Sequence, residues 1–148
     1  MNKTETISSF FNSKCFAISG VSKDEKKFGR VVYKTFIEHG LNAIPINPTI
    51  NEINGIKVYS SISELPSDVD AVVILNNRNK SQDIIDQAIN RGIKNIWIQQ
   101  SSDPKGFSKS NIDQSFNVIT GECIFMWLEP VMGVHKFHRF FKFLFSKN

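Results

Sequence analysis

The chain has 148 residues, 41% of them hydrophobic and 22% charged, which is typical of one globular domain with a buried core and excludes a disordered chain. Its formal net charge is +4, but every Asp and Glu precedes Pro130 and the last four cations follow it, so we expect no nucleic-acid surface spread over the domain. The two cysteines are too few for a disulfide framework, and the chain lacks a secretory signal and an apolar run of about 18 residues, so we expect a cytoplasmic protein and no membrane span.

The first predicted unit is a strand, a loop and a helix. Residues 15–19 form an apolar run that ends at Gly20. Apolar or small residues then recur at helical spacing until Gly40, at Val31, Val32, Thr35, Phe36 and Ile37. Unpaired backbone N–H groups and the positive end of the helix dipole should converge at the loop, and an anion such as phosphate fits there. Neither of the usual glycine fingerprints, GxGxxG or GxxxxGK[ST], is present.

The rest of the chain continues this alternation. Four more strands are predicted at residues 42–47, 70–75, 95–99 and 116–120. The helix before the fourth strand has the apolar stripe Ile84, Ile85, Ala88 and Ile89 and ends near Gly92. Between residues 48 and 69 we expect a turn at Asn54–Gly55 and one short helix. The pattern predicts a single α/β domain, a Rossmann-like doubly wound parallel sheet of five strands in the order 3-2-1-4-5.

Ligands of such a sheet bind at the carboxyl ends of the strands, near the point where strand order reverses. The residues at the ends of the predicted strands, Gln99 among them, are polar and neutral to positive, although loops at strand ends are polar in any case. Where nicotinamide dinucleotide sites usually carry an acid, after the second strand, this chain has Asn47 and Pro48. Such a site does not repel a ribose that already carries a phosphate, as coenzyme A does. Cations are available near it at Lys27, Arg30, Arg78 and Lys80.

Three stretches of the sequence resemble the coenzyme A-binding family of small Rossmann-like proteins. They are FAISGVSKDEKKFG (16–29), the block from Ala43 to Ile74 and DQAINRGIKNIWIQ (86–99), and the late Cys123 adds to them. The same module resembles the N-terminal domain of the succinyl-coenzyme A synthetase alpha subunit and of NDP-forming acyl-coenzyme A synthetases. The resemblance covers residues 10–125 and is most specific in INP…NEINGIKVYSSISELP. Thr49 stands where the family often has Lys.

The resemblance implies a coenzyme A site with three parts. The pyrophosphate would be received by Gly20, Val21, Ser22, Lys27, Phe28, Gly29 and Arg30. The adenosine phosphate would be bordered by Asn47 and Pro48, and the adenine and pantetheine side would be lined by Leu75, Asn76, Asn77 and Arg78. The synthetases need a phosphohistidine segment and an ATP-grasp partner, which we expect this chain to be too short to contain. The resemblance therefore implies binding of coenzyme A or an acyl-CoA without catalysis.

The sequence contains no Ser-His-Asp ordering and no zinc spacing. His39 lies near the end of the first predicted helix, where a cation suits the dipole. His135 and His138 could share a helix face, but no third metal ligand is evident, so we expect no metal. Cys123 is either a small buried hydrophobe or a thiol at the mouth of the site that forms a mixed disulfide with the pantetheine sulfur. The sequence leaves both open.

Residues 126–148 are predicted to form a helical extension of the domain of residues 1–125. One apolar stripe is formed by Phe137, Phe140, Phe141, Leu144 and Phe145, with the cations elsewhere on the wheel. We expect this helix to pack on the same domain or on a second subunit, and docking to a protein partner or an anionic membrane is the alternative. Two other functions stay open, an NAD(H)-binding redox-sensing module and an interaction protein that acts through this helix.

Overall fold

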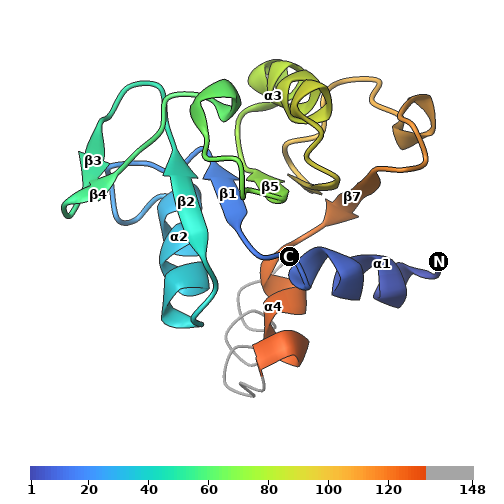
Figure 1. Ribbon diagram of the computed structural model, residues 1–148, viewed down its shortest axis with the longest axis horizontal. Coiled ribbons are helices and arrows are strands. Elements are labelled where there is room, and N and C mark those ends of the chain that lie inside the picture. Colours follow the sequence, from blue (N-terminus) through green and yellow to red (C-terminus); the bar gives the residue numbers. More distant parts are fainter. Residues whose placement is uncertain (133–148) are drawn as a thin grey trace, which may run out of the picture.

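The structure is a computed structural model and describes residues 1–132 (Figure 1). One parallel sheet contains β1 (Phe16–Ser19), β2 (Ala43–Ile46), β5 (Ala71–Ile74), β6 (Asn95–Gln99) and β7 (Asn117–Glu122). The α-helices of the described residues are α1 (Lys3–Phe11), α2 (Phe28–Glu38), α3 (Arg78–Arg91) and α4 (Phe125–Met132). A hairpin and two 3-10 turns complete the fold, β3 (Glu52–Ile53), β4 (Ile56–Lys57), η1 (Ile62–Glu64) and η2 (Lys109–Asn111). Within residues 1–132 no helix has both the length and the apolar character needed to cross a membrane.

The predicted fold class is confirmed, but the predicted strand order is wrong in detail. The observed order is β2-β1-β5-β6-β7. If the five strands of this sheet are numbered 1 to 5 along the chain, the order is 2-1-3-4-5 and not the predicted 3-2-1-4-5. All four residues of β5 are buried, as a strand inside a sheet requires. In contrast, β2 contains Pro45, which has no N–H for a ladder bond and is tolerated at a sheet edge. The third strand therefore lies beside β1, and the second forms the edge.

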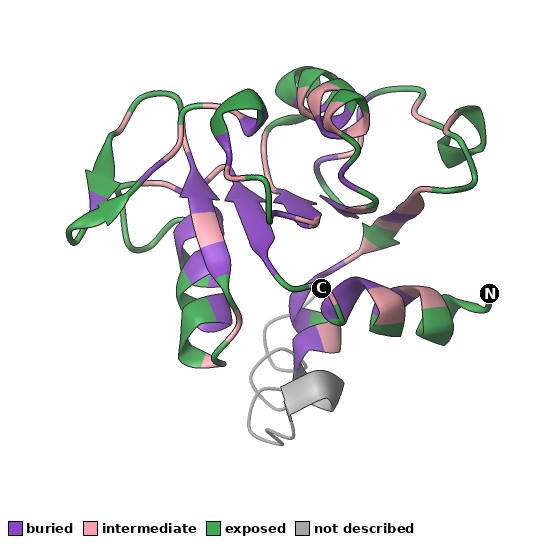
Figure 2. Cartoon of the chain, in the orientation of Figure 1, coloured by how far each residue is buried: buried purple, intermediate pink, exposed green. Residues whose placement is uncertain are grey.

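The sheet separates two hydrophobic cores. Figure 1 shows α1, α2 and α4 on one side of the strands and α3 on the other. The first core is aromatic, with ring centroids 5.3 Å apart for Phe10 and Trp97 and also for Phe16 and Phe36. The second core is aliphatic and joins Ile85 of α3 to the opposite face of the strands. In Figure 2 the central strands are buried along their length, whereas the β3–β4 hairpin is largely exposed.

Helix α1 was not predicted from the sequence. It begins with a capping box, in which the Glu5 N–H donates to Asn2 Oδ1 and the Asn2 N–H donates to Glu5 Oε2, both at 3.0 Å. Its buried residues are Ile7, Phe10 and Phe11, which belong to the aromatic core. The helix therefore forms because it covers the sheet and is capped locally, although it is short.

The orientation of α2 differs from the predicted apolar stripe. Val32, Thr35 and Phe36 are buried as expected, but Val31 and Ile37 are 36% and 46% exposed. The helix is turned so that Gly29 faces the loop after β1, and this places Tyr33 inside and Val31 outside. The C-cap of α2 is His39, near the helix end as predicted.

The local turn predictions are confirmed. Asn54 and Gly55 have φ values of 50° and 80°, so both central residues of the β3–β4 turn are left-handed, as a tight hairpin requires. Helix α3 ends at Gly92, whose φ of 78° forms a left-handed C-cap. The predicted stripe over 137–145 and both late histidines lie outside the described residues.

Candidate functional site

The carboxyl ends of β1, β2 and β5 meet at the loop that follows β1. The N–H groups of Gly20 and Val21 both donate to the Ile46 carbonyl of β2 at 3.2 Å. On the other side, the Leu75 N–H donates to the Ser19 carbonyl at 3.0 Å. Because β2 and β5 flank β1, strand order reverses here, which is where doubly wound sheets bind their ligands.

Gly20 lies against the segment that follows β5. A Cβ on Gly20 would stand 3.2 Å from the Leu75 carbonyl carbon and 3.3 Å from the Asn76 nitrogen, and its φ of 99° also favours glycine. The buried Ser19 hydroxyl donates to Asn76 Oδ1 at 2.7 Å and fixes this approach. Sequence reasoning named Gly20 and Asn76 but missed Ser19, because a serine inside an apolar run carries no signal of its partner.

Gly29 allows α2 to begin in contact with the same loop. A Cβ at this position would lie 2.0 Å from the Gly20 carbonyl oxygen and 2.9 Å from its carbon. No side chain fits there without movement of the backbone. A side chain at Gly29 would therefore meet the protein's own loop before it could meet a ligand.

Two helices begin at this edge of the sheet with unsatisfied backbone donors. The N-cap residues Lys27 of α2 and Asn77 of α3 make no side-chain capping bond, and neither helix has an acid in its first turn. In α2, the N–H groups of residues 28–30 have no acceptor within residues 1–132. Such a helix start attracts an anion, because its N–H groups and the helix dipole present positive charge.

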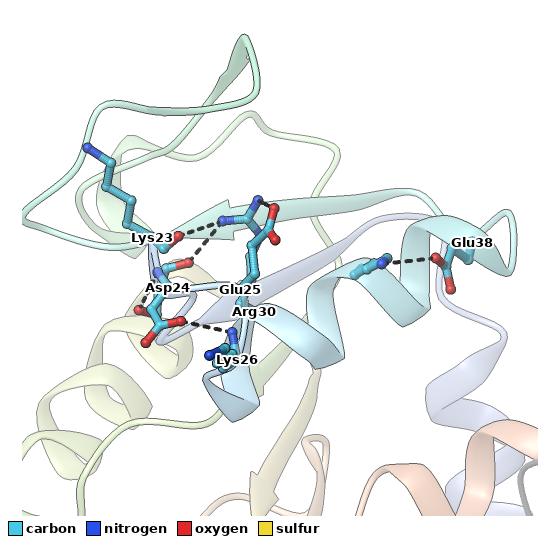
Figure 3. Close-up of polar contacts among 8 residues, drawn as sticks. Lys23, Asp24, Glu25, Lys26, Arg30 and Glu38 are labelled. Atoms are coloured by element: carbon cyan, nitrogen blue, oxygen red, sulfur yellow. Dashed lines mark hydrogen bonds and ion pairs between the residues drawn. The ribbon is translucent and has the colours of Figure 1, made fainter.

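The side chain of Arg30 holds the loop backbone. It is 8% exposed, and its Nη1 donates to the carbonyl oxygens of Ser22 and Lys23 at 3.4 and 3.1 Å. Its Nη2 lies 3.9 Å from the Glu25 carboxylate. Figure 3 shows the guanidinium between these groups. The backbone N–H of Arg30 is thus available to an anion at the start of α2, while Nη1 of its side chain orders the loop backbone.

The loop is also stabilised by its own short polar side chains. The Asp24 N–H donates to Ser22 Oγ at 3.0 Å, and Asp24 Oδ1 accepts from the Lys26 N–H at 2.9 Å (Figure 3). These bonds form turns that leave the N–H groups of Ser22 and Lys23 without an acceptor in the described part of the chain. Two further donors are therefore available in the loop, beside those of α2.

Asn47 connects the end of β2 to this loop. Its Nδ2 donates to the Val21 carbonyl at 2.8 Å, while its Oδ1 accepts from the Thr49 N–H and hydroxyl, each at 2.8 Å. The amide is thus used for positioning, and the exposed Pro48 and Thr49 are the parts of this segment that face solvent. A carboxylate at this position could not donate to the Val21 carbonyl.

The positive charge of the edge comes from exposed side chains. Lys27, Arg78 and Lys80 are exposed and form no ion pair with any acid of residues 1–132. Residues 1–132 contain no group of three or more His, Cys, Asp or Glu that could hold a metal ion. The arrangement therefore presents unpaired cations and N–H donors to an anionic ligand.

Cys123 lies beyond β7 in the aromatic core and is 6% exposed. The following Ile124 N–H donates to the buried Gln99 Oε1 at 3.0 Å, which fixes the start of α4. Phe28 of α2 contacts Phe125 of α4 with ring centroids 5.3 Å apart, so the first turn of α2 lies next to this segment. The burial of Cys123 agrees with the small-hydrophobe interpretation. Gln99 was predicted only as a residue of the polar edge, and its capping contact was missed.

Comparison with known proteins identifies the family of the chain. A family model described as a CoA binding domain matches residues 14–128. The chain belongs to this CoA-binding family. Its α/β fold with a five-stranded parallel sheet is the fold implied by the sequence resemblance.

Relatives of this chain include both enzymes and small proteins. It is 32% identical over 90 residues to the alpha subunit of ADP-forming acetate–CoA ligase II of Pyrococcus furiosus, which covers 60% of this chain and 20% of the subunit. It is 27% identical over 99 residues to YneT of Bacillus subtilis, an uncharacterized protein, covering 67% of this chain and 73% of that one. The chain thus spans about a fifth of the ligase subunit but most of the small relative.

A solved structure of a conserved hypothetical protein from Pyrococcus furiosus also matches this chain. The TM-score is 0.67 at 28% identity, with 76% of this chain and 96% of that one covered. The match therefore extends over nearly all of a separate small protein.

Proposed function

We propose that this protein binds coenzyme A, or an acyl-CoA, and acts as a binding module without catalysis of its own. The observation that carries the proposal is the contact of Gly29 with the Gly20 carbonyl, which brings the open N–H groups of the loop and of α2 to one place. Membership of the CoA-binding family supports this choice of ligand.

In the proposed complex the pyrophosphate binds at the start of α2. It accepts hydrogen bonds from the N–H groups of residues 28–30 and of Ser22, and the ammonium of Lys27 adds a charge-assisted contact. The adenosine phosphate lies beside Asn47 and Pro48. The pantetheine runs past the segment after β5, over Leu75, Asn76, Asn77 and Arg78, toward Cys123.

The proposal of a binding role is supported by the share of each relative that the match covers. In the ligase alpha subunit the matching region is a fifth of the chain, so other parts of that enzyme lie outside the likeness. In contrast, the match to the small relative from Bacillus subtilis covers 73% of that protein. We infer that the module works here as a ligand-binding unit in the cytoplasm.

The decisive experiment identifies the ligand carried by the full-length protein. Protein is purified under native conditions and denatured, and the released small molecules are identified by mass spectrometry. Melting temperatures are then measured with added coenzyme A and with NADH, because a ligand that prefers the native state raises the melting temperature by mass action. Coenzyme A should be released and should raise the melting temperature. A shift with NADH, and none with coenzyme A at millimolar concentration, would contradict the proposal.

A variant pair tests the location of the site. Lys27→Gln removes the unpaired cation at the N-cap of α2 and should weaken coenzyme A binding about tenfold, the effect of one charge-assisted contact. Lys34→Gln is the matched control on the same helix, since Lys34 is exposed and faces Glu38 at 3.8 Å. Equal affinities in the two variants would place the pyrophosphate elsewhere.

A further inference from the structure

A cavity lies next to the proposed coenzyme A site and shares Arg30 with it. It is a groove of about 400 Å³ between α2 and the β3–β4 hairpin. A volume of this size is within the range of small-molecule sites, about 300–1,000 Å³. The groove is therefore large enough for a ligand of its own.

Three isoleucines and a tyrosine form the apolar part of the groove's lining, which also contains Asn54 and charged side chains. Ile53 and Tyr33 form buried parts of the lining, and Ile37 and Ile56 are 46% and 50% exposed. Burying these two isoleucines against an apolar ligand would be favourable, at about 25 cal/mol for each Å² removed from water. The polar pair at the rim, Lys34 and Glu38, is 3.8 Å apart and adds no net charge.

A buried cation forms one side of the groove. Arg30 is 8% exposed, and its Nη1 is used by the carbonyl groups of Ser22 and Lys23. The carboxylate nearest to its Nη2 is that of Glu25, at 3.9 Å, which is too long for a hydrogen bond, and the Glu25 side chain is 82% exposed. A guanidinium has five N–H donors and prefers a carboxylate bound through two of them. Arg30 thus has donors for a better-placed carboxylate, and Glu25 is a loose and replaceable partner.

We propose that this groove binds an amphipathic monocarboxylate, such as a medium-chain fatty acid. The carboxylate takes the place of Glu25 on Arg30, and the aliphatic chain lies on Ile37, Ile53 and Ile56. Both halves of this ligand are matched by the groove, the charge by a buried cation and the chain by isoleucines, of which Ile37 and Ile56 are exposed. The proposal does not rest on coenzyme A binding, because the carboxylate contacts Nη2 of Arg30 whereas the pyrophosphate was assigned to backbone N–H groups.

The test is an NMR titration of the full-length protein with octanoate, and with octanol as the uncharged probe of equal chain length. Octanoate should shift resonances of α2 and the hairpin saturably and bind at least about tenfold more tightly than octanol, as loss of a charged contact predicts. Glu25→Gln should tighten octanoate binding about threefold, because the competing carboxylate is removed. Ile56→Asp should weaken it by about tenfold or more, because a charge then faces the chain.

The octanoate titration has a matched control variant on the hairpin. Glu52→Gln makes the same change of charge on the hairpin, at an exposed residue that does not line the groove, and should leave octanoate affinity unchanged. Equal affinity for octanoate and octanol would overturn the role of Arg30. No saturable shift up to the solubility limit of octanoate, or an Ile56→Asp variant that binds as the parent does, would overturn the site itself.

Discussion

The indole Nε1 of Trp127 donates a hydrogen bond of 3.0 Å to Glu122 Oε2, and the ammonium of Lys3 forms an ion pair with the same carboxylate. These contacts join α1, β7 and α4, the elements that close the aromatic core. Burial alone would raise the pKa of Glu122, but the hydrogen bonds from Lys3 and Trp127 and the charge of Lys3 outweigh it and hold the pKa below its usual range.

A pH dependence of stability follows from this cluster. A carboxyl whose pKa is lowered by folding stabilises the native state above its unfolded pKa, and this contribution is lost as the pH falls through the folded pKa. Glu122→Gln should therefore lower the free energy of unfolding by about 1 kcal/mol at pH 7 and by much less near pH 3. Urea unfolding at both pH values measures the difference. A loss of the same size at pH 3 would show that ionisation of Glu122 is not the cause.

Substitution of Gly29 should affect the fold as well as the ligand. Gly29→Ala places a Cβ 2.0 Å from the Gly20 carbonyl oxygen, and overpacking of this kind costs about 1–3 kcal/mol. We expect the free energy of unfolding to fall by that amount and coenzyme A binding to be lost. Lys34→Ala, at an exposed position of the same helix, is the control for helix propensity. If Gly29→Ala unfolds at the same urea concentration as the parent, α2 does not begin against the loop.

The thiol of Cys15 should be inert in the native protein. Burial, together with the charges of Asp68 and Asp70, raises its pKa to about 11, so only about one thiol in a thousand is ionised at pH 8. Since the thiolate is the reactive form, alkylation should be at least about 100-fold slower in native than in urea-unfolded protein. Peptide mapping after timed iodoacetamide treatment separates Cys15 from Cys123. Rapid native labelling of Cys15 would show that its burial is incomplete.

Thr49 offers a gain-of-affinity test. It is exposed beside Asn47 and Pro48, where the resembled family often has Lys. Thr49→Lys should strengthen binding of coenzyme A about fivefold through its 3′-phosphate, and should leave binding of dephospho-coenzyme A unchanged. Calorimetry with both ligands measures this difference, and Thr49→Gln separates charge from side-chain length. A similar gain for both ligands would mean that the lysine does not reach the 3′-phosphate.

The parts of the fold that depend on local sequence were predictable. The Asn54–Gly55 turn and the Gly92 cap follow from backbone preferences of two or three residues. Strand order depends on which strands pair across the sheet, so it was not predicted correctly, although Pro45 already marked β2 as an edge strand. Helix α1 was missed despite the Asn2 and Glu5 capping box, because its sequence is short and its stability comes from core packing.

In the candidate site, too, the features set by local sequence were predictable and those set by contacts across the fold were not. Gly20 and Gly29 were identified because a strand, a loop and a helix in sequence define where a helix begins. Their partners were not identifiable, since the Ser19 to Asn76 hydrogen bond joins residues 57 positions apart. The use of the Arg30 side chain was also not visible in the sequence, because a cation near a helix start looks the same whether it faces solvent or its own loop.

The edge position of β2 has a consequence for self-association. An open strand edge is a template on which another chain can add and from which fibrils can grow. Here Pro45 offers no N–H, its carbonyl accepts from the Tyr59 N–H at 3.0 Å, and the Asn47 N–H donates to the Tyr59 carbonyl at 2.9 Å. The segment after the hairpin therefore occupies the end of this edge with the protein's own backbone. Strand addition is therefore blocked at the carboxyl end of β2, and β7 is the other edge of the sheet.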